Sequence, residues 1–383
     1  MNGKADPVFS EYIIDGTQMD TTPADSLRDC MFGDAWEEFL KRYRKDVPED
    51  GGRKRDIVID EPIDPAPERF SYDREEIPKY IQEVIAAPDE QDSVNLTHPR
   101  SSTRIKVART LLDTLWRKGE FHLEDIRMNA SWKWDTGPVG NMSSFYMSTV
   151  SAAQYIYDLG VKISGLSIET SRGCHQARFE AFPPGDSLST EEAGRICTDT
   201  LGKDADTSSW IIYVPFDTCP HRLGGSVLAG VLGKGNETGP EILDPDYFMD
   251  CYEVMRELVE DGVVLCGRTV SRGGLARALT LMLGENARME TDLSGIGKAC
   301  LEDDPVRILF AETPGAVIQV RDSDFDYVDS QFLLQDIAYY PLGHPVTAGP
   351  ELKPGISPLQ KGRTGLSSIL ASLMTGLSSE GED

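Results

Sequence analysis

Apolar residues in the second half of the chain repeat with helical spacing in some segments and form short strand-like runs in others. A helical pattern over 252–264 leads into the apolar run 263–266, and a second helical pattern covers 275–283 (LARALTLML). Between them lies the glycine-containing stretch 267–275 (GRTVSRGGL). This order predicts a strand, a tight turn and the start of a helix.

The same arrangement occurs earlier in the chain. The apolar run 209–215 predicts a strand, the stretch 220–226 (PHRLGGS) a Gly-Gly turn, and the residues from Val227 onward a helix. A third strand is predicted over 309–320, with a turn at Pro314-Gly315. A helix N-terminus presents free backbone N–H groups, so both Gly-Gly turns are candidates for holding an anion. The alternative is that the glycines only allow helix and strand to pack closely.

The first hundred residues are polar, acidic and interrupted by proline. Apolar periodicity predicts helices over 34–43 and 77–87, and 57–59 is a short strand candidate. We therefore expect residues 1–103 to form an arm with short helices. At the other end, 367–377 has helical spacing within a proline- and glycine-rich segment, so we expect 346–383 to be a flexible tail.

Four segments between these regions have a distinctive order. A helical pattern over 104–115 precedes 130–134 (ASWKW), and a long helical pattern over 143–160 precedes 165–170 (GLSIET). In chain order, these segments and the two turns resemble the long form of phosphoribosylformylglycinamidine synthase, within the aminoimidazole ribonucleotide synthase superfamily. Its corresponding motifs are Asn-Trp-Met-Trp, Gly-Lys-Asp-Ser-Leu-Ser-Met, Arg-Leu-Gly-Gly-Ser, His-Asp-x-Ser-Asp-Gly-Gly-Leu and Phe-x-Glu-x-x-Gly-x-x-x-x-Val.

The resemblance covers about 104–344 and implies an α/β (α+β) fold. It suggests a synthase C-terminal-like domain over 186–345, with helices packed on a mixed sheet. A reduced α+β lobe over 104–185 would precede that domain.

The chain departs from the family where catalytic side chains are implied. Arg268 stands in place of His, Thr269 in place of the first Asp, and Arg272 in place of the second; Leu166-Ser167 replaces a Lys-Asp pair. The family activates an amide with ATP before adding ammonia, so it must hold Mg²⁺ and phosphates. Mg²⁺ requires carboxylate and other oxygen ligands, and an arginine repels it. The departures suggest a retained fold with a lapsed active site and no catalytic residues.

Arginine can still bind phosphate or carboxylate through its planar guanidinium. A metal-free anion or nucleotide site therefore stays open as a hypothesis. Its candidate residues come from the two turns and are Arg222, Gly224, Gly225, Ser226, Arg268, Ser271, Arg272, Gly273 and Gly274.

Charge narrows the class of partner. The 383 residues carry a net charge of −26, which argues against generic binding to nucleic acid or to anionic membranes. We expect protein partners, with basic proteins favoured, or a homo-oligomer. We also expect a cytoplasmic protein, because no apolar signal core or membrane-length apolar run is present.

Cysteine and histidine spacing indicates neither a disulfide framework nor a metal site. The seven cysteines form no CxxC pair and their number is odd, so we expect free thiols in a reducing compartment. The five histidines lack metal-ligand spacing. Asp322, Asp324 and Asp326 would share one face of a strand, but such a run is more typical of a solvated turn.

Three functions follow from these observations. The first is a non-catalytic synthase-like protein acting as a structural or protein-interaction subunit, as in a large or viral assembly. The second is an ATP-dependent synthase-type amidoligase component of purine biosynthesis. The third is a phosphate- or nucleotide-sensing module. We expect no cofactor except under the second hypothesis, which requires ATP and Mg²⁺.

Overall fold

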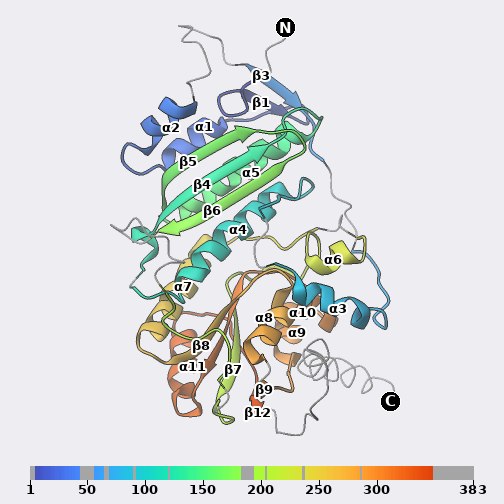
Figure 1. Cartoon of the computed structure of the whole chain (residues 1–383), viewed down its shortest axis with the longest axis vertical. Helices are drawn as coiled ribbons and strands as arrows, with labels where there is room; N and C mark the ends of the chain where they lie inside the picture. The colour runs from blue at the N-terminus through green and yellow to red at the C-terminus, as the bar shows by residue number, and fades with distance from the viewer. Residues whose placement is uncertain are drawn as a thin grey trace. The chain divides into compact units, whose positions relative to one another are not determined.

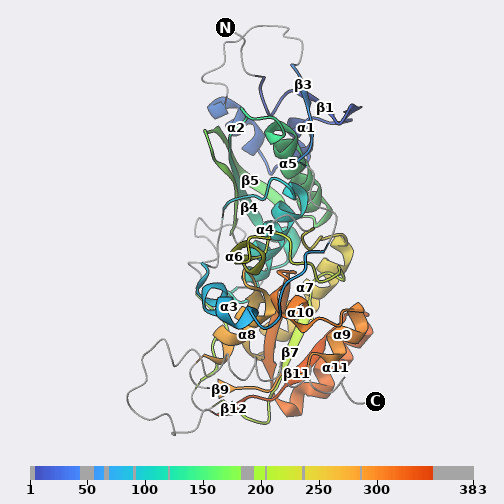
Figure 2. The same cartoon turned by 90° about the vertical axis from the view of Figure 1, so that its right-hand side faces the viewer.

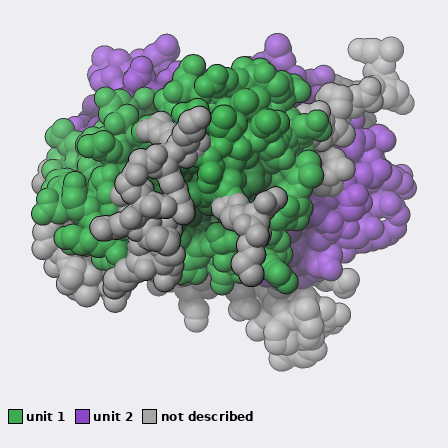
Figure 3. Space-filling model, turned by 90° about the horizontal axis from the view of Figure 1, so that it is seen from above, with its two compact units in different colours: residues 1–67, 91–114, 121–193 green, residues 68–90, 115–120, 194–383 purple. Residues whose placement is uncertain are grey.

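The computed structural model describes residues 5–43, 56–63, 69–88, 92–119, 121–182, 194–202, 205–234, 238–284 and 287–347. The chain divides into two compact units, which are coloured separately in Figure 3. Unit 1 comprises residues 1–67, 91–114 and 121–193, and unit 2 comprises 68–90, 115–120 and 194–383. Both units are therefore assembled from segments that lie far apart in the sequence.

Unit 1 contains a three-stranded mixed sheet in the order β5 (Lys162–Thr170), β4 (Arg127–Trp134) and β6 (His175–Phe182). Strand β4 runs parallel to β5 and antiparallel to β6. Two helices, α4 (Pro99–Thr114) and α5 (Asn141–Asp158), pack together and cover the sheet (Figure 1). Alternate residues of β4 are buried, and the indole of Trp132 donates to Ser148 of α5 at 3.0 Å. The helices expected over 104–115 and 143–160 are confirmed.

The N-terminal residues of unit 1 also fold. Strands β2 (Thr17–Gln18), β1 (Glu11–Ile14) and β3 (Ile57–Asp60) form a second sheet in that order. Helix α1 (Pro23–Asp29) packs on α5 and helix α2 (Ala35–Tyr43) on β5, and a 3-10 helix, η2 (Leu123–Asp125), precedes β4. The helix and strand expected over 34–43 and 57–59 are thus confirmed, whereas the boundaries at 104, 186 and 346 stay predictions.

Unit 2 is organised on a four-stranded sheet in the order β11 (Tyr340–Gly343), β7 (Trp210–Pro215), β10 (Gly315–Val320) and β8 (Val264–Val270). Every neighbouring pair in this sheet is antiparallel. The expectation of a mixed sheet here is corrected, because β10 lies between β7 and β8 and keeps these two parallel strands apart. A two-stranded sheet of β9 (Ala287–Arg288) and β12 (Val346–Thr347) completes the strands of the described part.

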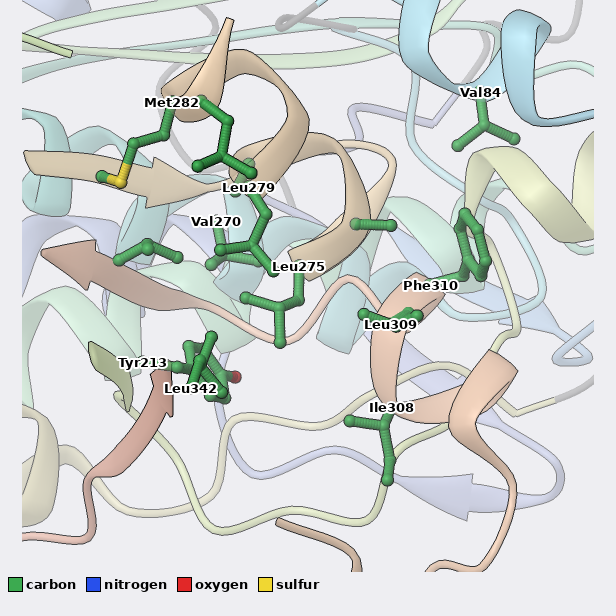
Figure 4. Packing of buried hydrophobic residues seen from close by; sticks show 14 of the residues in the cluster. Val84, Tyr213, Val270, Leu275, Leu279, Met282, Ile308, Leu309, Phe310 and Leu342 are labelled. Carbon is green, nitrogen blue, oxygen red and sulfur yellow. The ribbon is translucent and has the colours of Figure 1, made fainter. Parts of the chain in front are cut away.

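One face of this sheet is covered by five helices, α3 (Ile77–Ala86), α6 (Val227–Val231), α8 (Gly274–Leu283), α9 (Ser294–Cys300) and α10 (Pro305–Phe310). Their apolar side chains form one buried cluster with side chains from all four strands (Figure 4). Helix α7 (Pro245–Glu260) packs against β8 and α11 (Phe325–Leu334), which follows a 3-10 helix, η3 (Asp322–Asp324). The structure confirms the α/β class and the helices expected over 77–87 and 275–283.

Three boundaries differ from the sequence expectations, each for a local reason. Helix α7 begins at Pro245 because Asp244 caps it, its carboxylate accepting from the backbone of Tyr247. Strand β8 continues to Val270, so Arg268 and Thr269 belong to the strand and the turn begins at Ser271. Residues 309–310 end α10 instead of starting a strand. The helix expected over 367–377 lies outside the described residues.

Among the described helices, none is both long and apolar enough to cross a lipid bilayer.

A first prediction concerns the close packing at the start of α8. Gly274 has φ +66°, and a Cβ there would lie 2.6 Å from the carbonyl oxygen of Leu309. Gly262 has a similar φ of +68° but open space around it. We expect Gly262→Ala to cost about 1–2 kcal/mol from backbone strain alone and Gly274→Ala at least twice as much. Urea unfolding measures both, and equal losses would show that backbone packing at Gly274 is unimportant.

Candidate functional site

The two Gly-Gly turns meet at a carboxylate of the chain itself. One oxygen of Glu312, Oε1, accepts hydrogen bonds from the backbone N–H of Val227 and from that of Gly273, both at 2.8 Å. Val227 begins α6, and Gly273 is the N-cap of α8. Glu312 therefore supplies negative charge at two helix N-termini, where free N–H groups and the helix dipole favour it.

The strand order explains how these three segments come together. Gly315, the first residue of β10, pairs with Pro215 at the end of β7 and with Val270 at the end of β8. The turns that leave β7 and β8 and the residues that enter β10 thus share one edge of the sheet. Glu312 lies on this edge three residues before β10, in the segment 311–314 that links α10 to the strand.

Glycine at the two turns has a specific conformational role. Gly225 has φ +74° and Gly273 has φ +82°, values in the left-handed region that side chains disfavour. The hydroxyl of Ser226 accepts from the backbone of Ala229 at 3.1 Å and so caps α6. Gly224 donates its N–H to the carbonyl of Thr238, and the carbonyl of Ser271 accepts from Gly274.

The candidate arginines have separate partners within the chain. Arg268 lies on β8, where its guanidinium contacts the carboxylate and the carbonyl of Asp199, each at 3.3 Å. Arg272 donates to the carbonyl of Pro88 at 3.3 Å, near the end of α3. Arg222 pairs with Glu241 at 3.5 Å on the surface. The sensing hypothesis needs these guanidinium groups to converge, and no described contact brings them together.

Thr269 is engaged in a buried contact. The indole N–H of Trp116 donates to its hydroxyl at 2.8 Å, and both residues are buried. The same indole ring lies against Gly267, where an added Cβ would be only 2.2 Å from it. The position at which the family resemblance places an aspartate therefore packs against tryptophan.

Among the predicted site residues, the backbone N–H of Gly273 contacts Glu312 directly. On the other turn the contact is made by Val227, the residue after the predicted Ser226. Glu312, which joins them, was not among the candidates. Its signal in the sequence was its place in the Phe-x-Glu-x-x-Gly pattern, formed here by Phe310, Glu312 and Gly315.

A second carboxylate in the same role, also outside the candidates, lies in unit 1. Asp60 at the end of β3 accepts from the backbone of Gly140 at 2.7 Å and of Ser143 at 2.9 Å. These residues form the first turn of α5, whose N-cap Gly140 has φ +85°. No local pattern predicts this contact, because eighty positions separate Asp60 from Gly140.

Two buried ionisable groups lie on the loop between β7 and α6. The carboxylate of Asp217 accepts from the backbone of Cys219 and of Leu243, which partly offsets the rise in pKa that burial causes. His221 is buried, and its Nδ1 has no hydrogen-bond partner in the described part of the chain. Burial lowers the pKa of His221 to about 4, so the ring is neutral at pH 7.

The remaining metal and thiol candidates have structural explanations. No group of three or more His, Cys, Asp or Glu side chains among the described residues is arranged to hold a metal ion. Asp322 accepts from the indole of Trp210 and Asp324 pairs with Arg321, so the aspartate run forms a surface turn, as expected. All seven cysteines are free thiols, as predicted.

Comparison with known proteins identifies a domain and distant relatives. Residues 210–346 match the family described as AIR synthase related protein, C-terminal domain. The human and Drosophila melanogaster phosphoribosylformylglycinamidine synthases, and a probable chloroplastic/mitochondrial one from Arabidopsis thaliana, are each 24% identical to the chain. The matches cover 70%, 66% and 68% of this chain, respectively. They cover 20%, 20% and 18% of the relatives, so the chain spans about a fifth of their length.

Solved structures give weaker likenesses. Thermotoga maritima PurL complexed with FGAR has a TM-score of 0.46 at 12% identity, covering 85% of this chain and 50% of that one. Hydrogenase maturation protein HypE in complex with ATP has a TM-score of 0.41 at 13% identity, covering 83% and 89%. The domain match and the three relatives confirm the family resemblance drawn from the sequence motifs.

A second prediction tests the carboxylate between the turns. Glu312→Ala leaves two backbone N–H groups without their acceptor, which we expect to cost about 2–4 kcal/mol. Glu312→Gln keeps an acceptor oxygen without the charge and should lose less. Glu241→Ala, at an exposed ion pair, is the control and should change stability by less than about 1 kcal/mol. Denaturant unfolding measures all three, and a loss for Glu312→Ala no greater than the control would contradict the assignment.

A third prediction uses the neutral state of His221. Its folded pKa of about 4 lies below the ordinary 6.5, so the unfolded chain binds the proton first as pH falls. The contribution of neutral His221 to the free energy of unfolding is complete above pH 6.5 and disappears as the pH falls toward 4. Between pH 7 and pH 5 the native protein should lose roughly 2 kcal/mol more than His221→Gln. Parallel pH dependences of unfolding for the two proteins would contradict a buried neutral histidine.

Proposed function

We propose that this chain, which carries an AIR synthase related C-terminal domain over residues 210–346, acts as a non-catalytic subunit that binds other proteins. The fold supplies an α/β framework. The turns at which an ATP-dependent relative would be expected to handle charge are instead used for internal contacts.

The observation that carries the proposal is the engagement of three substituted positions. Arg268 is paired with Asp199, Thr269 is bonded to Trp116, and Arg272 is bonded to the carbonyl of Pro88. An arginine at either of two of these positions repels Mg²⁺ where a carboxylate would bind it, and Thr269 offers no carboxylate. Thr269 and Arg268 are therefore part of the packing of unit 2, whereas the contact of Arg272 lies at its surface.

Glu312 by itself does not separate an active from an inactive protein. The family motif also carries a glutamate at this position, so the same contact is expected in an active synthase. The argument for lost catalysis rests on the three substituted positions, whereas Glu312 explains how the two turns are held together.

A second candidate function is an ATP-dependent phosphoribosylformylglycinamidine synthase-type ligase component of purine biosynthesis. The three synthase relatives favour it, because the similarity extends over about two thirds of this chain. Sequence similarity supports this candidate better than it supports a structural role. Since the chain spans about a fifth of those enzymes, it would act with other subunits that supply the remaining parts.

A fourth prediction separates the two candidates. A ligand present at a hundred times its Kd stabilises the folded form by about 2.7 kcal/mol, which is several degrees in melting temperature. We expect no such rise with 10 mM ATP and Mg²⁺, and no ATP-dependent formation of phosphoribosylformylglycinamidine from its amide precursor and ammonia. One of the synthases that the chain resembles serves as the positive control.

The same assays on Arg272→Asp complete the test. This change restores a carboxylate at one position only, so we expect it to create no turnover. ATP-dependent amidation by the unmodified chain would overturn the non-catalytic proposal and support the ligase component.

A further inference from the structure

Helix α11 exposes an apolar face that no described element covers. The outward side chains are Asp326, Tyr327, Ser330, Leu333 and Leu334, which at ~100° per residue lie within ~120° of the helix surface. Tyr327, Leu333 and Leu334 are 45%, 65% and 76% exposed. The opposite side buries Val328 and Phe332, and α11 runs along the outside of unit 2 (Figures 1 and 2). We call the five outward residues together with Asp336 the α11 face.

The α11 face carries two carboxylates, Asp326 and Asp336, within an acidic stretch of the chain. Between residues 322 and 347 the chain carries five aspartates and no lysine or arginine. Three of these carboxylates have partners within the chain: Asp322 accepts from Trp210, Asp324 pairs with Arg321, and Asp329 accepts from the hydroxyl of Tyr339. The carboxylates of Asp326 and Asp336 make no ion pair within the described residues.

Asp336 also adopts an unusual backbone conformation. It has φ +55° at the end of α11, where its N–H donates to Leu333 and the next N–H, of Ile337, donates to Phe332 at 2.9 Å. This is the helix-terminating geometry in which glycine is strongly favoured. Aspartate adopts this conformation more readily than most residues, and here it ends the helix with its carboxylate two residues after the exposed Leu334.

We propose that the α11 face docks a basic amphipathic segment of a partner protein. Apolar side chains of that segment pack on Tyr327, Leu333 and Leu334, while its lysines or arginines lie opposite Asp326 and Asp336. A second copy of this chain fits less well, because two such faces would bring unpaired aspartates together. That a partner protein uses this surface rests on the proposed function; the exposed leucines and carboxylates that would bind a basic amphipathic peptide do not depend on it.

The experiment uses the full chain and a defined probe. The probe is a fluorescein-labelled 14-residue amphipathic helical peptide of lysine and leucine, followed by fluorescence anisotropy. Two probe controls are a peptide with glutamate in place of lysine and one with serine in place of leucine. We expect only the lysine–leucine peptide to bind, and its affinity to fall as salt rises from 50 to 300 mM.

Protein variants then locate the site. Leu333→Ser with Leu334→Ser should weaken peptide binding at least tenfold, and Asp326→Asn with Asp336→Asn should weaken it several-fold and flatten the salt dependence. Leu243→Ser is the matched control, because Leu243 is 64% exposed and lies beside Glu241 and Asp244. It should leave binding unchanged. Circular dichroism checks that each variant is folded.

Asp336 offers a readout that a purely structural role would not produce. Asp336→Gly relieves the left-handed strain and should raise the urea midpoint while weakening peptide binding. Asp336→Asn keeps a residue that tolerates this conformation, so it should weaken binding without the same gain in stability.

Two results would overturn the proposal. Equal binding by all variants would mean that the peptide responds only to the net charge of the whole chain. A dimer in sedimentation that Leu333→Ser with Leu334→Ser dissociates would make a second copy the occupant. Neither result depends on ATP turnover, so failure of the docking surface and failure of the non-catalytic proposal can be told apart.

Discussion

The hydrogen bonds from Val227 and Gly273 to one oxygen of Glu312 hold together the edge of unit 2 at which β7 and β8 end and β10 begins. Both donors sit at helix N-termini, which carry partial positive charge and would repel each other if they met without an intervening anion. A buried carboxylate satisfies both and fixes the approach of α6 and α8 to the sheet. The close packing of Gly274 against the backbone of Leu309 and Ala311 depends on the same approach.

Unit 1 uses the same arrangement independently. Asp60 caps the first turn of α5 from a strand eighty residues away, and Gly140 supplies the left-handed turn that allows it. In both units a glycine turn exposes backbone N–H groups, and a carboxylate from a distant segment accepts from them. The sequence predicts an anion site at a glycine turn that precedes a helix. At these turns the anion is a carboxylate of the chain itself, Glu312 in unit 2 and Asp60 in unit 1.

The elements of the fold could be predicted from the sequence, but the carboxylate that occupies the two turns could not. Periodicity identified α5, α7 and α8 because their apolar faces repeat locally, and the resemblance identified the domain because motif order is also readable along the chain. The contact of Glu312 was not readable, since it depends on β10 lying between β7 and β8, and β7 precedes β10 by about a hundred residues. Likewise Arg268 was assigned to a turn because it lies in a glycine-containing stretch, whereas pairing with β10 makes it part of β8.

The distribution of charged side chains disfavours an anionic ligand at the two turns. An anionic ligand at the two turns would have to displace Glu312, which is tethered at high effective concentration, and would approach a chain of net charge −26. The arginines that would favour such a ligand are held by Asp199, Glu241 and the carbonyl of Pro88. Uncompensated negative charge lies instead at Asp326 and Asp336, beside exposed leucines on α11. The α11 face therefore combines two carboxylates that make no ion pair within the described residues with exposed apolar side chains, and the ligand chemistry that complements both is a basic, amphipathic protein segment.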